Sequence, residues 1–198
     1  MRLSASCEHE LLAYERTQMA LSLVNSEASS NRPVSLDWPA IQFAQFEHDE
    51  KYHPEISRLP VQDRLRHMTL HFAKYAGRLS EGPTDADFER LATDALIIGI
   101  SCANTLNIDL SKVGDAISPD QRDEFARQMT VYAGRMASAC ERLDHLEDFP
   151  FRPTLAEQVL KVISASLGVF FSNGWSPVEK MRERLAAVKA KKLFHGKL

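Results

Sequence analysis

The chain has 198 residues, of which 44% are hydrophobic and 26% are charged, and its formal net charge at pH 7 is −3. This length and composition are typical of a globular protein with one sizeable core. The slightly negative charge argues against a general nucleic-acid-binding protein.

Cysteine usage and the first residues indicate the cellular compartment. The three cysteines lie far apart and form no C-x-x-C pair, so nothing suggests a disulfide framework or a zinc knot. The N-terminal residues lack the apolar stretch of a signal peptide. The longest purely aliphatic stretch, residues 95–100, is too short to span a bilayer. We therefore expect a cytoplasmic protein without a membrane segment.

Helix signals begin close to the N-terminus. A first helix is predicted over residues 6–25, followed by a polar linker. Asp37 can cap a second helix, with Pro39 in the first turn, where its missing N–H costs nothing. This helix should end before Pro54.

The next two helices form the centre of the chain. Apolar residues at spacings of three and four predict a third helix over Val61–Ser80. Gly82 and Pro83 stop it, and Thr84 can cap a fourth helix over residues 85–106. Because the connecting turn is short, we expect the two helices to pack as an antiparallel hairpin.

Three further helices are predicted in the second half of the chain. Ser118 marks the start of a long fifth helix that reaches about residue 147. Thr154, with Glu157 three residues later, marks the start of a sixth, and Ser176 marks the start of a seventh. No convincing alternating strand accompanies them.

The predicted fold is therefore all-α: one domain over residues 1–198, folded as a compact bundle of about seven helices. Its core is expected over residues 38–115, and a second helical half over residues 118–198 ends in a basic helix. Residues 66–70 can be aligned with residues 127–131, which would make the four central helices a duplicated pair. Shared helical periodicity gives the same match by chance, so both explanations stay open.

The fourth helix contains an isolated carboxylate. Residues 91–103 are apolar on nearly every side, as in a helix surrounded by others, except for Asp94. A buried carboxylate requires a cation or hydrogen-bond donors. Ser101 lies two turns further along the same face.

The third helix carries a polar stripe beside its apolar face. The stripe has residues at spacings of four, three and four, namely His67, His71, Lys74 and Arg78. Asp63 extends it by one turn. In an antiparallel hairpin the stripe can face Asp94 and supply its partner. Either the contact is a structural ion pair beside a solvated face, or the groove binds a charged ligand.

Three segments of this region resemble the MazG-like, all-α nucleoside triphosphate pyrophosphohydrolases. They cover residues 42–48, 60–79 and 94–110, and the clearest parts are the Asp94 run and the ending Asn107-Ile-Asp-Leu. The family has one helix with an E-x-x-E pair and one with E-x-x-D, whose carboxylates hold Mg²⁺ at the triphosphate. The resemblance implies cleavage to monophosphate and pyrophosphate, and a dimer or higher oligomer.

The chain departs from the family pattern at most of the metal ligands. His71 and Lys74 stand where the E-x-x-E pair falls, and Leu91 stands where E-x-x-D begins. Asp94 alone matches, and we predict it as the metal ligand, for magnesium. The residues predicted to bind the ligand directly are His67, His71, Lys74, Arg78 and Ser101.

Alternatives to this set of residues remain. With a different register, the carboxylates of the site would be Glu47, Asp49 and Glu50. Two histidines four residues apart, His67 and His71, also have the spacing of transition-metal ligands, although surface histidines share it. The basic tail over residues 180–198 is predicted to dock on the body as an amphipathic helix, or to close over an anionic ligand.

The predicted function is binding of a nucleotide or another phosphorylated small molecule, by a homo-oligomer, with hydrolysis left open. The alternative is a non-enzymatic helical interaction or oligomerisation protein whose polar stripe is a subunit contact. The chain has neither a G-x-x-x-x-G-K-[ST] sequence nor a glycine-rich strand–helix turn, which argues against P-loop and Rossmann chemistry.

Overall fold

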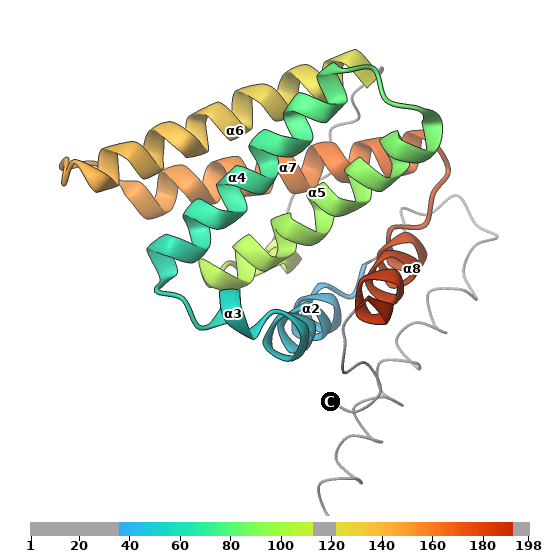
Figure 1. Cartoon of the computed structure of the whole chain (residues 1–198), viewed down its shortest axis with the longest axis horizontal. Coiled ribbons are helices and arrows are strands. Elements are labelled where there is room, and N and C mark those ends of the chain that lie inside the picture. Colours follow the sequence, from blue (N-terminus) through green and yellow to red (C-terminus); the bar gives the residue numbers. More distant parts are fainter. Residues whose placement is uncertain (1–35, 113–121, 192–198) are drawn as a thin grey trace, which may run out of the picture.

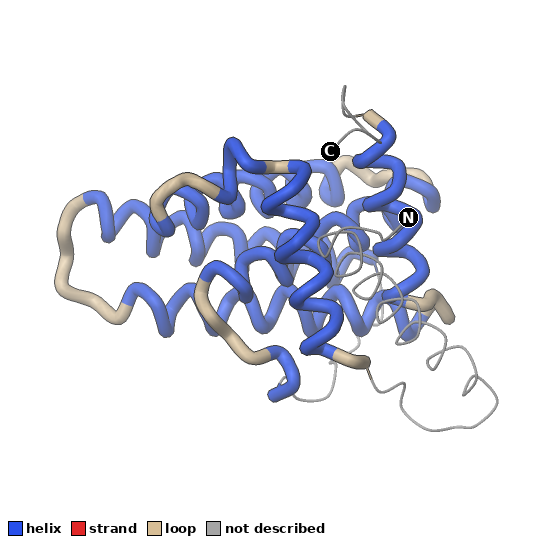
Figure 2. The backbone as a smooth tube through the Cα atoms, turned by 90° about the horizontal axis from the view of Figure 1, so that it is seen from below, coloured by secondary structure: helices blue, strands red, loops and turns tan. Residues whose placement is uncertain are grey.

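The computed structural model describes residues 36–112 and 122–191. Within these two ranges all regular structure is helical, which confirms the all-α prediction (Figure 2). In chain order the elements are α2 (Trp38–Tyr52), α3 (Pro54–Ser57), α4 (Val61–Ser80), α5 (Asp85–Thr105), η1 (Leu110–Lys112), α6 (Arg122–Asp144), α7 (Phe151–Ser172) and α8 (Pro177–Ala190).

Four long helices, α4 to α7, form the core of the bundle. Helix α4 packs on α6 and on α5, and α7 packs on both α5 and α6. In Figure 1 these four helices lie side by side along the long axis, and α2 and α8 are seen almost end-on beneath α5. Helices α2 and α8 both pack on α5, so they cover one side of the hairpin formed by α4 and α5.

Helix α5 is the most deeply buried element of the bundle. Every residue from 91 to 103 except Ile98 is buried. Its neighbours are α4, α7, α2 and α8, which together surround it. The prediction of a helix that is apolar on all sides is therefore confirmed, and Asp94 lies inside this buried stretch at 8% exposure.

Three predicted helix starts are confirmed by their capping bonds. The Asp37 carboxylate accepts a hydrogen bond from the Ala40 N–H at 3.1 Å at the start of α2. The Thr84 hydroxyl accepts one from the Asp87 N–H at 3.2 Å at the start of α5. The Ser176 hydroxyl caps α8 in the same way.

The predicted start of α7 at Thr154 is wrong. The helix begins at Phe151, and the Thr154 hydroxyl donates to the carbonyl oxygen of Pro150 at 2.8 Å instead of capping. The helix can begin one turn earlier because Pro153 then falls in the first turn, where backbone N–H groups have no partner inside the helix.

Two other bounds differ from the expectations. The four-residue helix α3 was not predicted, and α6 ends at Asp144 because Leu146 adopts a positive φ of 53°. The predicted helix over residues 6–25 and the predicted cap Ser118 lie outside the described residues.

Helix α7 is long and apolar enough to cross a membrane, the one such helix in the described ranges. In the bundle it packs between α5 and α6, and 61% of its most apolar window is buried. The apolar composition of α7 is therefore explained by its place in the core of the bundle.

The contact between α5 and α7 at Gly99 gives a test of the packing. A Cβ on Gly99 of α5 would lie 2.8 Å from Cγ1 of the buried Ile163 in α7. Gly99→Ala should therefore lower the free energy of unfolding, because overpacking costs about 1–3 kcal/mol and exceeds the gain of up to about 1 kcal/mol in helix propensity.

Gly77→Ala on α4 is the matched control, because no atom lies within 4 Å of its added Cβ. Urea denaturation should show this variant to be equally stable or more stable than the unmodified protein. Equal stabilisation by the two substitutions would contradict the described crossing of α5 and α7.

Candidate functional site

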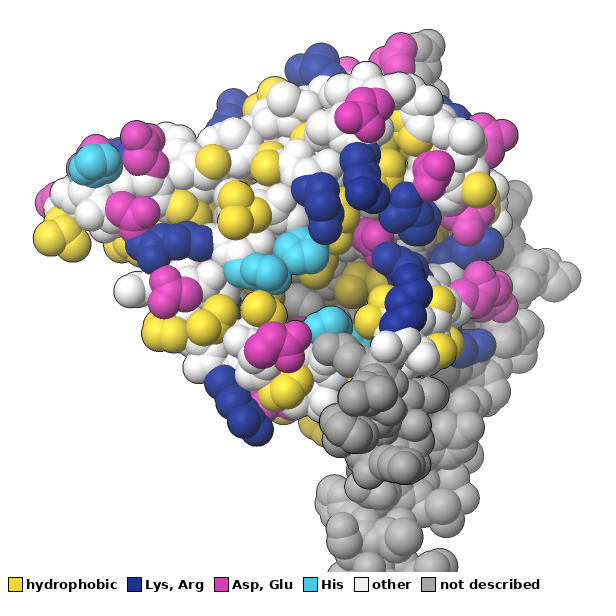
Figure 3. Space-filling view, in the orientation of Figure 1, with side chains coloured by type: hydrophobic (Ala, Val, Ile, Leu, Met, Phe, Trp, Pro, Cys, Tyr) yellow, Lys and Arg dark blue, Asp and Glu magenta, His cyan; other side chains and the backbone are white. Residues whose placement is uncertain are grey.

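A pocket of about 310 Å³ opens on the face of the molecule drawn in Figure 3. Its lining comes from five helices, α2, α3, α4, α5 and α8. In the figure, Lys, Arg and His side chains gather around a hollow at its centre. A pocket of this size is in the range of small-molecule sites.

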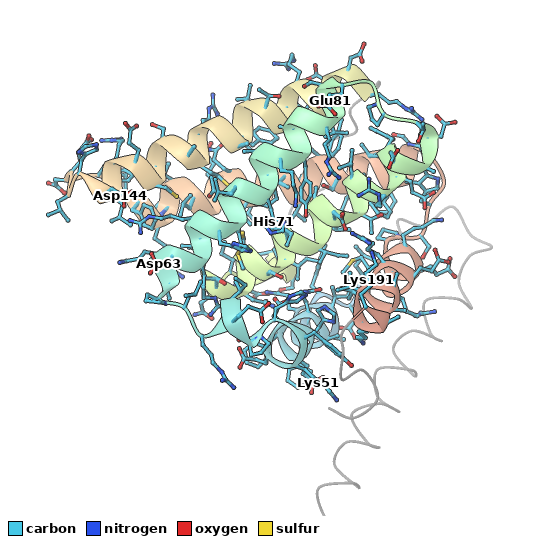
Figure 4. The ribbon with its side chains drawn as sticks, in the orientation of Figure 1. Lys51, Asp63, His71, Glu81, Asp144 and Lys191 are labelled. Carbon is cyan, nitrogen blue, oxygen red and sulfur yellow. The ribbon has the colours of Figure 1, made fainter. Side chains whose placement is uncertain are left out.

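The hairpin brings all six predicted site residues to this one pocket. Its lining includes His67, His71, Lys74, Arg78, Asp94 and Ser101. Figure 4 marks His71 near the middle of α4, between Asp63 and Glu81 at the two ends of the helix. Asp63 itself does not line the pocket; it pairs with Arg66 at 2.7 Å.

The partner of Asp94 was not predicted. We expected it on the stripe of α4, but Arg184 of α8 binds both carboxylate oxygens, with Nε–Oδ1 at 2.6 Å and Nη2–Oδ2 at 3.0 Å. Arg90 lies further away, with its Nη1 3.9 Å from Oδ2. A bidentate Arg–carboxylate pair has the geometry of a strong, charge-assisted contact. It fixes α8 against α5 and makes α8 a wall of the pocket.

The sequence contained a signal for Arg184. Met181, Leu185 and Val188 form the apolar face of α8, and Met181 is buried while the other two line the pocket. Arg184 stands one turn after Met181 on this same face, where an unpaired cation would be costly. Its position therefore indicated a buried carboxylate partner, without saying which one.

Positive charge dominates the pocket, although the chain as a whole is negative. Two carboxylates, Asp49 and Asp94, line it. Five cationic side chains line it, namely Arg64, Lys74, Arg78, Arg90 and Arg184. Among the described residues, Arg64, Lys74 and Arg78 have no carboxylate within ion-pair distance, so three positive charges of the pocket are left uncompensated.

The two histidines of the stripe are bonded to each other. Nε2 of His71 lies 3.1 Å from Nε2 of His67, and Nδ1 of His71 lies 3.4 Å from Nζ of Lys74. The Tyr75 hydroxyl lies 3.0 Å from the same Nδ1 atom and can donate to it, and the Lys74 ammonium can only donate, so these contacts favour the His71 tautomer with its proton on Nε2. His71 then donates to His67, whose own proton is on Nδ1.

Burial and neighbouring charge keep both imidazoles neutral. Burial, followed by the charge of Lys74, lowers the pKa of His71 to about 4. The same two causes lower the pKa of His67. At neutral pH the stripe therefore presents cations at Lys74 and Arg78 and neutral rings at His67 and His71.

Helix α2 adds a second polar group to the pocket. The Ser101 hydroxyl donates to Oδ2 of Asp49 at 2.7 Å, and the Gln45 amide donates to Oδ1 at 2.8 Å. Burial raises the pKa of Asp49 despite these bonds. Of the three alternative carboxylates, Asp49 lines the pocket, whereas Glu47 and Glu50 are exposed and do not.

The predicted metal ligands are bonded to other side chains. Both oxygens of Asp94 are bound by Arg184, and His67 and His71 bind each other. No group of three His, Cys, Asp or Glu side chains that could hold a metal occurs in residues 36–112 and 122–191. The arrangement gives no support to the magnesium site predicted at Asp94, or to a transition-metal site on the two histidines.

The ion pair between Asp94 and Arg184 can be tested by its effect on stability. Arg184→Met keeps the apolar stem but leaves a carboxylate of 8% exposure without its main partner. We expect the free energy of unfolding to fall by about 1–3 kcal/mol. Arg182→Met, on the exposed side of α8, is the matched control and should change it little.

A double-mutant cycle measures the coupling itself. The loss on Arg184→Met should shrink when Asp94 is already replaced by Asn, because no carboxylate is then left unpaired. Equal losses in the two backgrounds would contradict the pairing.

The lowered pKa of His71 predicts how stability depends on pH. Between pH 6.5 and pH 4 the unfolded chain takes up a proton at this position and the folded chain does not. The free energy of unfolding should therefore fall as the pH is lowered through this window, and it should fall less in His71→Gln. Urea denaturation at pH 7 and pH 5 measures this difference. The same loss of unfolding free energy between the two pH values in both proteins would contradict a neutral, buried His71.

Searches of protein-family models, curated proteins and solved structures find no match to this chain. The resemblance to the MazG-like pyrophosphohydrolases stays a prediction, based on the sequence of residues 42–48, 60–79 and 94–110.

Proposed function

We propose that this protein binds a phosphorylated small molecule, of the nucleotide class, in the pocket bounded by α2, α4, α5 and α8. The observation that supports this most directly is the set of three cations without a carboxylate partner among the described residues, namely Arg64, Lys74 and Arg78. Phosphate oxygens accept charge-assisted hydrogen bonds from such groups. A positive pocket in a negative chain favours an anionic ligand over a cation.

The phosphate would bind at the end of the pocket that contains Lys74, Arg78 and Arg90. Lys74 and Arg78 are exposed and lie one turn apart on α4, and Arg90 lines the same pocket from α5. A bound phosphate would raise the pKa of the nearby His67 and His71, since a negative charge favours the protonated ring.

Hydrolysis is the further activity that the family resemblance implies. Of the two pocket carboxylates, Asp94 is held by Arg184 and Asp49 is held by Ser101 and Gln45. Neither belongs to a magnesium-type cluster. We therefore propose binding as the primary function, and cleavage of a nucleoside triphosphate to monophosphate and pyrophosphate as a second outcome to be measured.

The alternative function, a subunit contact through the polar stripe, is less well supported. The stripe lies in a pocket whose other walls, α2 and α8, belong to the same chain. A flat partner surface could contact the exposed Lys74 and Arg78 but not the buried Asp94. For the proposed homo-oligomer, α2 offers a better subunit contact, because its Phe43 and Phe46 are 56% and 49% exposed.

Binding can be measured by calorimetry and by thermal shift with the common ribonucleotides and deoxyribonucleotides. Lys74→Ala and Arg78→Ala should each weaken binding of a nucleoside phosphate by about tenfold or more, because each removes a charge-assisted hydrogen bond. Lys112→Ala, at a cation outside the pocket that pairs with Asp109, is the control and should leave affinity unchanged.

Pyrophosphate release in the presence of Mg²⁺ or Mn²⁺ separates the enzyme from the binding protein. Release that is lost in Asp94→Ala would support hydrolysis. Binding without release would support a binding protein. Neither binding nor release with any common nucleotide would contradict the proposal.

A further inference from the structure

The pocket has two chemically different ends. Because α4 and α5 are antiparallel, Arg64 of α4 and Ser101 of α5 lie towards one end, and Arg78 and Arg90 lie towards the other (Figure 1). The α4 wall from Arg64 to Arg78 is about 21 Å long at 1.5 Å per residue. Cations lie at both ends, Arg64 at one and Arg78 and Arg90 at the other, but only the end with Arg64 also contains buried polar side chains of α2. An extended ligand that spans both ends would fit better than a free phosphate ion.

The α2 end has a hydrogen-bond acceptor without a donor. Gln45 is 2% exposed, and its amide donates to Asp49, but its Oε1 atom has no partner in the described part of the chain. Leaving a buried acceptor unpaired is costly, so such an atom calls for a ligand or a structural reason. Each oxygen of Asp49 already accepts one hydrogen bond and can accept another.

Docking of α2 on the bundle does not supply that structural reason. Gln42, one turn earlier, already fastens α2 to the end of α5. Its amide donates to Asn104 at 2.9 Å and to the carbonyl oxygen of Ile108 at 2.8 Å, and its Oε1 accepts from the Leu110 N–H at 3.0 Å. Both the nitrogen and the oxygen of the Gln42 amide are hydrogen-bonded. Gln45 lines the pocket, and its amide oxygen has no hydrogen-bond partner among the described residues.

The hydrogen-bond acceptors of α2 and the apolar lining of the pocket together favour a ligand group that is flat and carries N–H donors. Gln45 Oε1 and the Asp49 carboxylate are neighbouring acceptors, so they match a ligand edge with neighbouring N–H donors. Met68 and Ile97, both buried, and Ile98 add apolar surface to the same pocket, which suits a flat ring. A nucleobase combines such a ring with such an edge.

We propose that the ligand is a nucleotide whose base presents neighbouring N–H donors, as guanine does at N1 and its 2-amino group. The base would bind Gln45 and Asp49, and the phosphate would bind Lys74 and Arg78. The inference rests on the proposed function and adds the class of base to it.

The test compares GMP, IMP and ribose 5-phosphate by calorimetry on the full-length protein. IMP differs from GMP by the absence of the 2-amino group, and ribose 5-phosphate has no base. We expect GMP to bind about tenfold or more tightly than IMP, and ribose 5-phosphate to bind most weakly. Asp49→Asn should remove the preference for GMP over IMP and leave the affinity for ribose 5-phosphate unchanged.

Glu47→Gln is the matched control, since Glu47 lies on the exposed side of α2 and should keep the preference. Gln45→Met, which replaces the amide by an apolar group of similar length, gives a second variant if Asp49→Asn does not fold. Equal affinity for GMP and IMP, with binding that still depends on Lys74, would overturn this inference and leave the proposed function standing. Absence of binding by all three compounds would overturn both.

Discussion

A carboxylate in the middle of a surrounded helix is the constraint on which this structure depends. Helix α5 is buried from residue 91 to residue 103 apart from Ile98, and Asp94 lies within this stretch. A charge in such a place needs a cation or hydrogen-bond donors in direct contact. Arg184 provides that contact with two short hydrogen bonds and thereby holds α8 across the open side of the hairpin. Together with the ion pair between Lys180 and Glu89 and the buried Met181, this pair holds α8 as a wall of the pocket.

The same pair explains the charge of the pocket. Because Arg184 neutralises Asp94, the stripe on α4 does not have to, and Lys74 and Arg78 stay uncompensated among the described residues. The carboxylate left over, Asp49, has a raised pKa because it is buried. A phosphate beside Lys74 and Arg78 would therefore meet little repulsion, because the nearby carboxylate of Asp94 is already paired with Arg184.

Much of the fold followed from local sequence, because helix periodicity and capping residues act over a few positions. The hairpin of α4 and α5 and the caps at Asp37, Thr84 and Ser176 were predicted on these grounds. The pairing with Arg184 was not, since 90 residues separate it from Asp94 and no local rule joins them. The main site residues were therefore predicted on α4 and α5, whereas α2 and α8 entered only as alternatives, through Asp49 and the basic tail, because their positions depend on tertiary packing.

The central claim is that a nucleotide phosphate binds beside the histidines of α4. The most direct measurement is an NMR titration of the His67 and His71 imidazole nitrogens with and without saturating GMP. The free protein should show a neutral His71 with its proton on Nε2 and a pKa of about 4. Saturation with GMP should raise the pKa of both rings, because a phosphate at Lys74 and Arg78 adds negative charge nearby. Unchanged pKa values for both histidines in the GMP-saturated protein would contradict the account.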